Sequence, residues 1–207
     1  MDPKAMQKLS YGLFVLTAKT GEKLNGCITN TAIQVTTEPN QIAFAVNKAN
    51  LTHDMVVESG RFVISIISEK AEFSLFKHFG FQSGRNVDKF ANFDSYKLTE
   101  SGIPYITAGI NAYLEGEVVS ASDLGTHTLF VCKVTDMEVL TEDASATYAY
   151  YHANIKPKPQ EVKKTEEGKV IWRCTICGYE YEGDPIPDDF ICPWCKHPAS
   201  DFERVVL

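Results

Sequence analysis

The residues best suited to chemistry lie near the end of the chain, where four cysteines form two C-x-x-C pairs, Cys174 with Cys177 and Cys192 with Cys195. Each pair can place two thiolates on one tight backbone turn, and two such turns make a tetrahedral site with four sulfur ligands. A site of this kind suits zinc or iron. The spacing alone therefore leaves two interpretations open, a structural zinc ribbon and a redox-active iron centre.

The residues around the cysteines favour the redox interpretation. From residue 178 to residue 191 the chain has five carboxylates and no lysine or arginine, which is unusual for a ribbon that binds nucleic acid. Aromatic residues also surround the cysteines. Their ordinary role in so short a segment is to form the core, but they also shield a metal from water, which affects its redox potential. These aromatic residues are Trp172, Tyr179, Tyr181, Phe190, Trp194 and Phe202.

The tail has a pattern that extends beyond its cysteines. From Trp172 it reads W-x-C-x-x-C-G-Y-x-Y, then GDP, then P-x-D-F-x-C-P-x-C. This pattern resembles rubredoxin over residues 170–207. The resemblance implies one iron atom, bound by all four cysteines and cycling between the ferric and ferrous states, and it favours iron over zinc. The stretch between the pairs is shorter than in rubredoxins that stand alone, and is more similar to rubredoxin tails fused to other redox domains.

The overall composition restricts the class of protein. A chain of 207 residues is long enough for one sizeable core and a small additional domain. Its net charge of −7 argues against a nucleic-acid-binding surface, which is normally basic. No apolar run reaches the ~18–20 residues of a membrane span, and the N-terminus lacks the pattern of a signal peptide. We therefore expect a cytoplasmic protein with reduced cysteines that binds neither nucleic acid nor a membrane.

The segment before the cysteines reads as many strands separated by a few short helices. We expect a hairpin turn at residues 20–22 and strands at 41–47, 61–67, 106–123 and 127–140, the last two joined by a turn at Gly125. We expect short helices at 2–9, 50–59, 69–80 and 145–154, with Gly60 and Gly80 as helix stops. This order lacks regular β-α-β alternation, so it predicts a mainly β fold built on an antiparallel barrel.

A change in composition marks the domain boundary. Residues 155–168 read IKPKPQEVKKTEEG, a charged stretch with two prolines and little to bury. Such a stretch is typical of a linker. The sequence therefore predicts a first domain at residues 1–154 and a second domain at residues 169–207.

Several segments of the first domain resemble the flavin reductase family. They are NGCITNT at residues 25–31, the Glu38-Pro39 turn, NKANLT at residues 47–52, and GTHTLFVCKV at residues 125–134. The resemblance implies a split β-barrel that binds FMN, usually as a homodimer. The short polar run and the absence of a G-x-G-x-x-G motif favour FMN over FAD.

The same segments supply the candidate cofactor-binding residues. Amides and hydroxyls of residues 25–31 can bond the ring edge and the ribityl-phosphate chain. Residues 47–52 lie where a strand gives way to a helix, and helix N-termini favour phosphate. A loop at residues 79–90 adds Arg85 and Lys89. The alternative is that these are ordinary polar residues of turns and strands. The predicted set is Asn25, Gly26, Cys27, Ile28, Thr29, Asn30, Thr31, Asn47, Lys48, Asn50, Thr52 and Lys89.

His127 is the candidate catalytic residue. It matches a family position usually written G-D-H-x-L-F, close to the flavin face where nicotinamide docks, but Thr126 replaces the acidic residue here. A carboxylate partner often fixes the tautomer of an imidazole, so this replacement bears on how His127 is oriented. The alternative is a structural role on a strand. The other four histidines, His53, His78, His152 and His197, have weaker claims.

The two halves together predict an electron-transfer enzyme. Nicotinamide donates two electrons as hydride, FMN accepts them together and releases them singly, and iron takes one at a time. The combination resembles the high-molecular-weight rubredoxins. That implies an NAD(P)H:rubredoxin/flavin oxidoreductase that passes electrons through FMN and iron to an acceptor such as a flavodiiron protein. One alternative is a flavoredoxin-like carrier that does not oxidise NAD(P)H itself. The other is a flavin-free barrel with a zinc ribbon, acting as a binding module.

Overall fold

The computed structural model describes residues 5, 8–157, 170–175, 178–192 and 198–206. The chain divides into two compact units, Met1–Lys156 and Pro157–Leu207. The predicted helix at residues 2–9 and the predicted linker at residues 155–168 fall largely outside the described residues. The domain limits drawn from the sequence therefore stay predictions.

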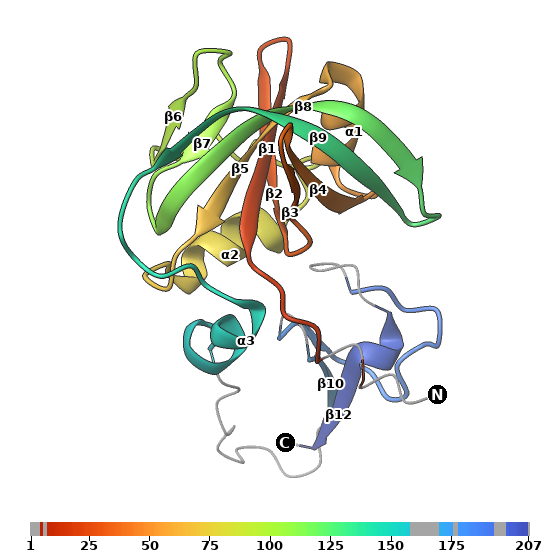
Figure 1. Ribbon diagram of the computed structural model, residues 1–207. Helices are drawn as coiled ribbons and strands as arrows, with labels where there is room; N and C mark the ends of the chain where they lie inside the picture. The colour runs from red at the N-terminus through yellow and green to blue at the C-terminus, as the bar shows by residue number, and fades with distance from the viewer. Residues whose placement is uncertain (1–4, 6–7, 158–169, 176–177, 193–197, 207) are drawn as a thin grey trace. The chain divides into compact units, whose positions relative to one another are not determined.

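The first unit is built on one antiparallel sheet of seven strands in the order β2-β1-β5-β8-β9-β4-β3 (Figure 1). A separate hairpin, β6 with β7, is paired on its own. The strands of this unit are β1 (Phe14–Thr20), β2 (Lys23–Thr29), β3 (Ile33–Thr37), β4 (Asn40–Asn47), β5 (Arg61–Ile67), β6 (Tyr96–Leu98), β7 (Pro104–Ile106), β8 (Ile110–Asp123) and β9 (His127–Val139).

The turns follow the glycines of the sequence. β1 and β2 form the hairpin predicted at residues 20–22, with Gly21 at φ 55°. The long strands β8 and β9 form the second predicted hairpin, which runs across the domain in Figure 1. Gly125 adopts φ 83° at its tip, and its N–H donates to Asp123 Oδ1 at 2.7 Å. A positive φ of this kind favours glycine, which is why glycines in the sequence marked the positions of these two turns.

The helices are short, and the first two pack against the strands. They are α1 (Leu51–Ser59), α2 (Phe73–Gly80) and α3 (Tyr148–Tyr150), with α3 continuing into a single wider turn at Tyr151–Ile155. Gly60 caps α1 with φ 67°, as predicted. Gly80 is the last residue of α2, and the cap is Phe81, so the predicted stop is one residue early. No helix in the described part of the chain is long and apolar enough to cross a membrane.

Three apolar clusters hold this domain together, and two of them are large. One joins α1 to the inner face of the sheet and contains the buried rings of Phe44, Phe62 and Phe130. The other joins α2 to the loop that follows it and to the turn after α3, and it contains Phe79 and Tyr151. Aromatic and β-branched residues dominate both clusters because these side chains pack well against a pleated surface.

The second unit is small. Its strands β10 (Val170–Cys174), β11 (Glu180–Tyr181) and β12 (Phe202–Val206) form a sheet in the order β11-β10-β12, and a short 3₁₀ turn, Ala199–Asp201, precedes β12. Cys177 and Cys195 lie outside the described residues. The mainly β fold class predicted from the sequence is confirmed for both units.

Candidate functional site

Strand β2 carries most of the first predicted cofactor-binding segment. It is an edge strand of the seven-stranded sheet, so one side of its backbone has no strand partner within that sheet. Gly26 lies in close packing at its centre, because a Cβ there would lie 3.0 Å from Thr17 Cγ2 and 3.1 Å from the Phe79 ring. Backbone amides and carbonyls on such an edge are available for pairing where no other part of the protein covers them, and the Gly26 carbonyl already accepts from Lys89. The position of β2 therefore fits the predicted hydrogen bonds to a flavin.

Four of the predicted residues gather in one place, which we call the buried cluster: Asn25, Cys27, Thr52 and Lys89. All four are at most 4% exposed. Asn25 Nδ2 donates to Thr52 Oγ1 at 2.9 Å, and Lys89 Nζ donates to the carbonyl oxygens of Gly26 at 2.8 Å and Phe79 at 2.9 Å. These side chains bond one another and the backbone, so they shape β2 from within the protein.

Burial sets the charge states in this cluster. It lowers the pKa of Lys89 from 10.5 to about 8. It also raises the pKa of the Cys27 thiol, against the smaller opposing effects of a hydrogen bond with Thr52 and of the Lys89 charge. Both shifts follow from the cost of placing a charge away from water. Cys27 is therefore a neutral thiol at neutral pH.

The end of β2 is fixed to β4 by two threonines. Thr29 Oγ1 and Thr31 Oγ1 donate to the Ala45 carbonyl oxygen at 3.3 and 3.0 Å, and Ala45 N donates back to Thr31 Oγ1 at 2.9 Å. Asn30, half-buried between them, makes no side-chain hydrogen bond to the described residues. Its amide is therefore the polar group of this segment that is best placed for a ligand.

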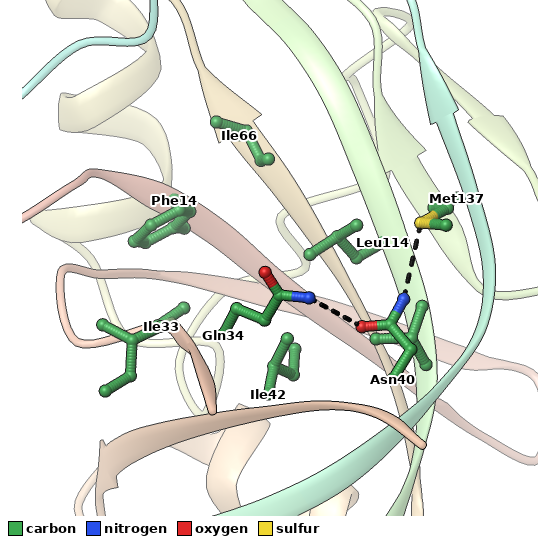
Figure 2. Close-up of a pocket in the computed structure, with 10 residues that line it drawn as sticks. Phe14, Ile33, Gln34, Asn40, Ile42, Ile66, Leu114 and Met137 are labelled. Carbon is green, nitrogen blue, oxygen red and sulfur yellow. Dashed lines mark hydrogen bonds between the residues drawn. The ribbon is translucent and has the colours of Figure 1, made fainter. Parts of the chain in front are cut away.

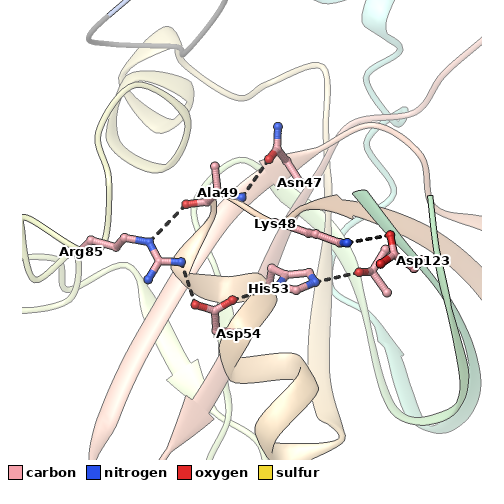
Figure 3. A network of polar contacts seen from close by, with 8 residues as sticks. Asn47, Lys48, Ala49, His53, Asp54, Arg85 and Asp123 are labelled. Carbon is pink, nitrogen blue, oxygen red and sulfur yellow. Dashed lines mark hydrogen bonds and ion pairs between the residues drawn. The ribbon is translucent and has the colours of Figure 1, made fainter. Parts of the chain in front are cut away.

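The second predicted segment forms a bend between β4 and α1 (Figure 3). Asn47 Oδ1 accepts from Ala49 N at 2.8 Å, and Asn50 is the N-cap residue of α1 without a side-chain capping bond. Lys48 Nζ pairs with Asp123 Oδ1 at 2.6 Å, which ties the bend to the β8–β9 hairpin. Lys48, together with the Gly125 amide, holds the pKa of Asp123 below its usual value.

A polar network that the sequence did not single out supports this bend (Figure 3). The ring of His53 lies 2.9 Å from Asp54 Oδ1 through Nδ1 and 2.8 Å from Thr128 Oγ1 through Nε2. Arg85 donates to Asp54 Oδ2 at 2.7 Å and to the Ala49 carbonyl oxygen at 3.3 Å. The hydrogen bonds from His53 and Arg85 hold the pKa of the Asp54 carboxyl below its usual value. The network joins α1, β9 and the loop after α2.

His127 is the first residue of β9 and is paired with Asn47 across the sheet. It is half-buried, and its Nδ1 lies 2.9 Å from Thr126 Oγ1. The threonine that replaces the acidic residue of the family pattern is therefore itself the partner of the imidazole. The pairing with Asn47 brings the predicted catalytic residue next to one predicted cofactor-binding segment.

Two cavities lie away from the predicted residues. The first, about 280 Å³, is mainly apolar (Figure 2), and there Gln34 Nε2 donates to Asn40 Oδ1 at 3.2 Å. Its lining residues are Phe14, Ala32, Ile33, Gln34, Asn40, Ile42, Ile66, Leu114, Val134 and Met137. The second, about 460 Å³, is polar, and Arg61, Tyr113, Glu115 and Asp136 are among its lining residues. Neither contains a predicted cofactor-binding residue.

Two of the four predicted metal ligands lie in the described part of the C-terminal domain. Cys174 and Cys192 are both buried, at 1% and 0% exposure. Cys174 begins a tight turn, in which Gly178 N donates to the Cys174 carbonyl oxygen at 2.9 Å and Cys174 N donates to the Tyr179 carbonyl oxygen at 2.8 Å. Gly178 has φ 79°, which favours glycine at this position. Buried thiols beside a tight turn fit a closed four-sulfur site.

The surroundings of the metal centre are aromatic and acidic, as expected. The rings of Tyr181 and Phe190 lie 4.7 Å apart, and those of Phe190 and Phe202 lie 5.5 Å apart. Two of the carboxylates are paired with arginines from neighbouring strands, Glu180 with Arg173 at 2.8 Å and Asp184 with Arg204 at 2.7 Å. Asp188 and Asp189 are exposed, and the two arginine pairs reduce the net negative charge of this domain's acidic segment.

Comparison with known families matches both parts of the chain. A family model described as "Flavin reductase like domain" matches residues 6–158. A second model, "Rubrerythrin, rubredoxin-like domain", matches residues 172–203. These matches agree with the two resemblances that the sequence motifs indicated.

Relatives extend this result to the whole chain. The chain is 40% identical over 230 residues to the "High molecular weight rubredoxin" of Moorella thermoacetica, covering 99% of this chain and 100% of that protein. It is 40% identical over 158 residues to the "Ferric-chelate reductase (NAD(P)H)" of Archaeoglobus fulgidus, covering 76% and 93%. An FMN-binding protein from Thermus thermophilus has a similar fold, with a TM-score of 0.58, 24% identity, and coverage of 67% of this chain and 77% of that one.

Proposed function

Because the chain belongs to the flavin reductase family and ends in a rubredoxin-like domain, we propose that it oxidises NAD(P)H and passes the electrons through FMN and a four-cysteine iron centre to a separate acceptor protein. The observation that carries the proposal is the pairing of both domains in one chain, with full-length similarity to a high molecular weight rubredoxin. The name of the ferric-chelate reductase supports NAD(P)H as the electron donor.

FMN would lie at the end of β2 that leads into residues 28–31, between the 25–31 segment and the 47–52 bend. When bound, FMN supplies the exchange between two-electron and one-electron chemistry. Asn30, Asn47 and Asn50 are the half-buried amides that would bond it. Lys48 and the N-terminus of α1 would contribute positive charge toward the phosphate. The buried cluster would hold the strand edge in place behind the ring.

His127 would orient the nicotinamide at the exposed side of the flavin. Its Nδ1 contact with Thr126 leaves Nε2 as the second polar atom of the ring. Hydride transfer needs no acid or base from the protein, so the role of His127 is positioning. His127→Ala should slow flavin reduction by NAD(P)H and leave reduction by dithionite unchanged.

Iron would be bound by Cys174, Cys177, Cys192 and Cys195. The two cysteines that the structure describes have buried sulfur-bearing side chains, as a closed site requires. Exposed carboxylates such as Asp188 and Asp189 would guide docking to a basic surface on an acceptor. We propose a flavodiiron-type protein as that acceptor, and the cytoplasm as the site of the reaction.

A homodimer completes the proposal. Strands β3 and β9 expose apolar side chains beside the apolar cavity: Ile33 is 63% exposed, Val35 44%, Met137 59% and Val139 68%. Apolar groups gathered on a surface mark an interaction site. A second copy of the chain would cover them. Equilibrium sedimentation of the full-length protein tests this, and a monomer at micromolar concentration contradicts it.

Anaerobic mixing of the FMN- and iron-loaded protein with NADH or NADPH tests the electron path. We expect the flavin band near ~450 nm to bleach first and the iron bands near ~490 nm to follow. If neither nucleotide bleaches the flavin rapidly, the protein is a flavoredoxin-like carrier reduced by another protein. If purified protein from iron-replete anaerobic cells shows neither band, it is a flavin-free barrel with a zinc ribbon.

A further inference from the structure

Lys89 is a buried cation that no ion pair neutralises among the described residues. Its side chain is 3% exposed, and both hydrogen bonds of its ammonium go to backbone carbonyl oxygens, those of Gly26 and Phe79. Carbonyl dipoles stabilise a buried charge less completely than a carboxylate does. The charge therefore acts on its surroundings over a longer range than the paired Lys48 and Arg85, which lie near solvent.

Several contacts hold Lys89 at this place. The loop that follows α2 packs directly on β2, since a Cβ at Gly84 would lie 2.2 Å from Asn25 Oδ1. The backbone of Lys89 is fixed by His78, whose Nε2 lies 2.7 Å from the Lys89 carbonyl oxygen. Phe79 O belongs to the last turn of α2, where the helix dipole favours a cation.

The bond to Gly26 also fixes the orientation of the strand edge. In an antiparallel pair, alternate residues turn their N–H and C=O groups toward and away from the neighbouring strand. Because the Gly26 oxygen accepts from Lys89, Gly26 belongs to the set that turns away from β1, and Ile28 follows two residues later. The ammonium thus lies at the edge of β2 that has no strand partner, where α2 and the loop after it cover Gly26, and the same edge continues through Ile28 toward the residues that would bond the flavin.

We infer that Lys89 raises the reduction potential of bound FMN, because its buried ammonium stabilises the negative charge that the flavin ring gains on reduction. This inference rests on the proposed function, since it requires FMN at the edge of β2. Two electrons and one proton convert FMN to its reduced monoanion, with NAD(P)H or a chemical titrant as the source of electrons. Lys89 bonds the backbone of β2, so it would act on the flavin through the electric field of its charge.

The buried position of Lys89 also couples reduction of the flavin to the uptake of a proton by this side chain. Among the described residues, the titratable group whose charge acts on the Lys89 ammonium is the Cys27 thiol on β2, while His78 on α2 contacts the Lys89 backbone carbonyl oxygen. Burial lowers the pKa of Lys89 to about 8, so the oxidised protein loses this charge above that pH. Reduction of the flavin restores the charge, and proton uptake per two electrons rises from about one toward two.

The test is a spectroelectrochemical titration of the full-length, FMN- and iron-loaded protein at pH 7. We compare the native chain with Lys89→Met, which removes the charge and keeps the length of the side chain, and with Lys77→Met, which removes an exposed lysine from α2. Lys89→Met should lower the ratio of reduced to oxidised FMN at a fixed potential about tenfold, or ~30 mV for a two-electron couple. Lys77→Met should match the native protein.

Equal flavin potentials in the native protein and Lys89→Met overturn the inference and leave the proposed function standing. If native protein binds no FMN, the proposed function fails, and this inference fails with it. If Lys89→Met does not bind FMN, the pH dependence of the flavin potential in the native protein is the test. This potential must fall more steeply with pH above about 8 than below it. A slope that does not steepen between pH 7 and 9.5 overturns the inference.

Discussion

The two domains hold their redox sites in different ways. The N-terminal domain has a seven-stranded sheet and three apolar clusters, and several polar side chains of its candidate site bond one another or the backbone. The C-terminal domain has a three-stranded sheet. Among its described residues five apolar or cysteine side chains are buried: Ile171, Cys174, Ile186, Cys192 and Phe202.

This difference indicates what each domain needs in order to fold. Two of those five buried side chains are cysteines, so a metal bound to them would be a large part of the interior of the C-terminal domain. Domains below about 40 residues usually require a metal, disulfides or a partner for stability. The N-terminal domain has enough apolar interior to fold first and bind its cofactor afterwards. The predictions below test this contrast, beginning with the largest expected effect.

Loss of the metal should unfold the C-terminal domain and spare the other. Structural metal sites contribute on the order of 10 kcal/mol to folding. Cys192→Ser should therefore abolish the iron bands and make the C-terminal domain sensitive to protease, with the FMN content unchanged. Cys132→Ala, which changes a buried cysteine of β9, should retain iron. Persistence of the iron bands in Cys192→Ser would remove this residue from the ligand set.

Lys89 should make the N-terminal domain more stable as the pH rises. Its folded pKa is about 8, below the unfolded value of 10.5, so the unfolded chain binds more protons between these values. Deprotonation then relieves the cost of the buried charge, by up to about 3 kcal/mol. Cys27 and Cys132 act in the opposite direction, since burial raises the pKa of both thiols.

The measurement is therefore a difference between two proteins. Urea unfolding is followed by circular dichroism from pH 7.5 to 10 for the native chain and for Lys89→Met. The stability of the native protein should rise relative to the variant across this range. Parallel pH profiles would show that the ammonium is not buried as described.

The hydrogen bond between Asn25 and Thr52 should contribute more than a surface contact. Thr52→Val keeps the volume and leaves the buried Asn25 amide without its partner, which should cost about 1–3 kcal/mol in the free energy of unfolding. Thr37→Val, at an exposed position of β3, should change stability by less than about 0.5 kcal/mol. Equal effects of the two substitutions would mean that the buried cluster is not a stabilising unit.

The Lys48–Asp123 pair should have the smallest effect on stability. Both side chains are more than one third exposed, and pairs of this kind contribute little to stability because water and salt screen them. Lys48→Met should therefore leave the unfolding free energy almost unchanged, and any difference should shrink in high salt. A loss comparable with that of Thr52→Val would show that the 47–52 bend depends on this pair.

The sequence predicted those parts of the fold that local chemistry determines. Gly21, Gly60 and Gly125 have positive φ and mark the hairpins and the end of α1 where the sequence placed them. The short hairpin of β6 and β7 was not predicted, because three-residue strands carry too little periodic signal. The matches to both families confirm the two domains that the motifs indicated.

The candidate site was less accessible to sequence reasoning, because its bonds join distant segments. Lys89 was expected to offer its charge to an anion, but its ammonium contacts Gly26, 63 positions away. His53 had a weak claim as a lone histidine, although the next residue, Asp54, is its partner, and Thr128 lies 75 positions away. The adjacent acidic residue was the one available signal; the Thr128 contact required the fold.

The central claim is that the fused tail receives its electrons from FMN within the same protein. The predicted 14-residue linker, 155–168, would span roughly 20 Å as a flexible coil and keep the iron near millimolar effective concentration at the flavin. The direct measurement is the rate of iron reduction after anaerobic addition of NAD(P)H. It compares the intact chain with the chain cut before Lys163, to which the separate iron-loaded tail is added at micromolar concentration. Flavin reduction should be equal in both, and reduction of the separate tail should be far slower and proportional to its concentration. Equal rates of iron reduction for attached and separate tails would contradict the account.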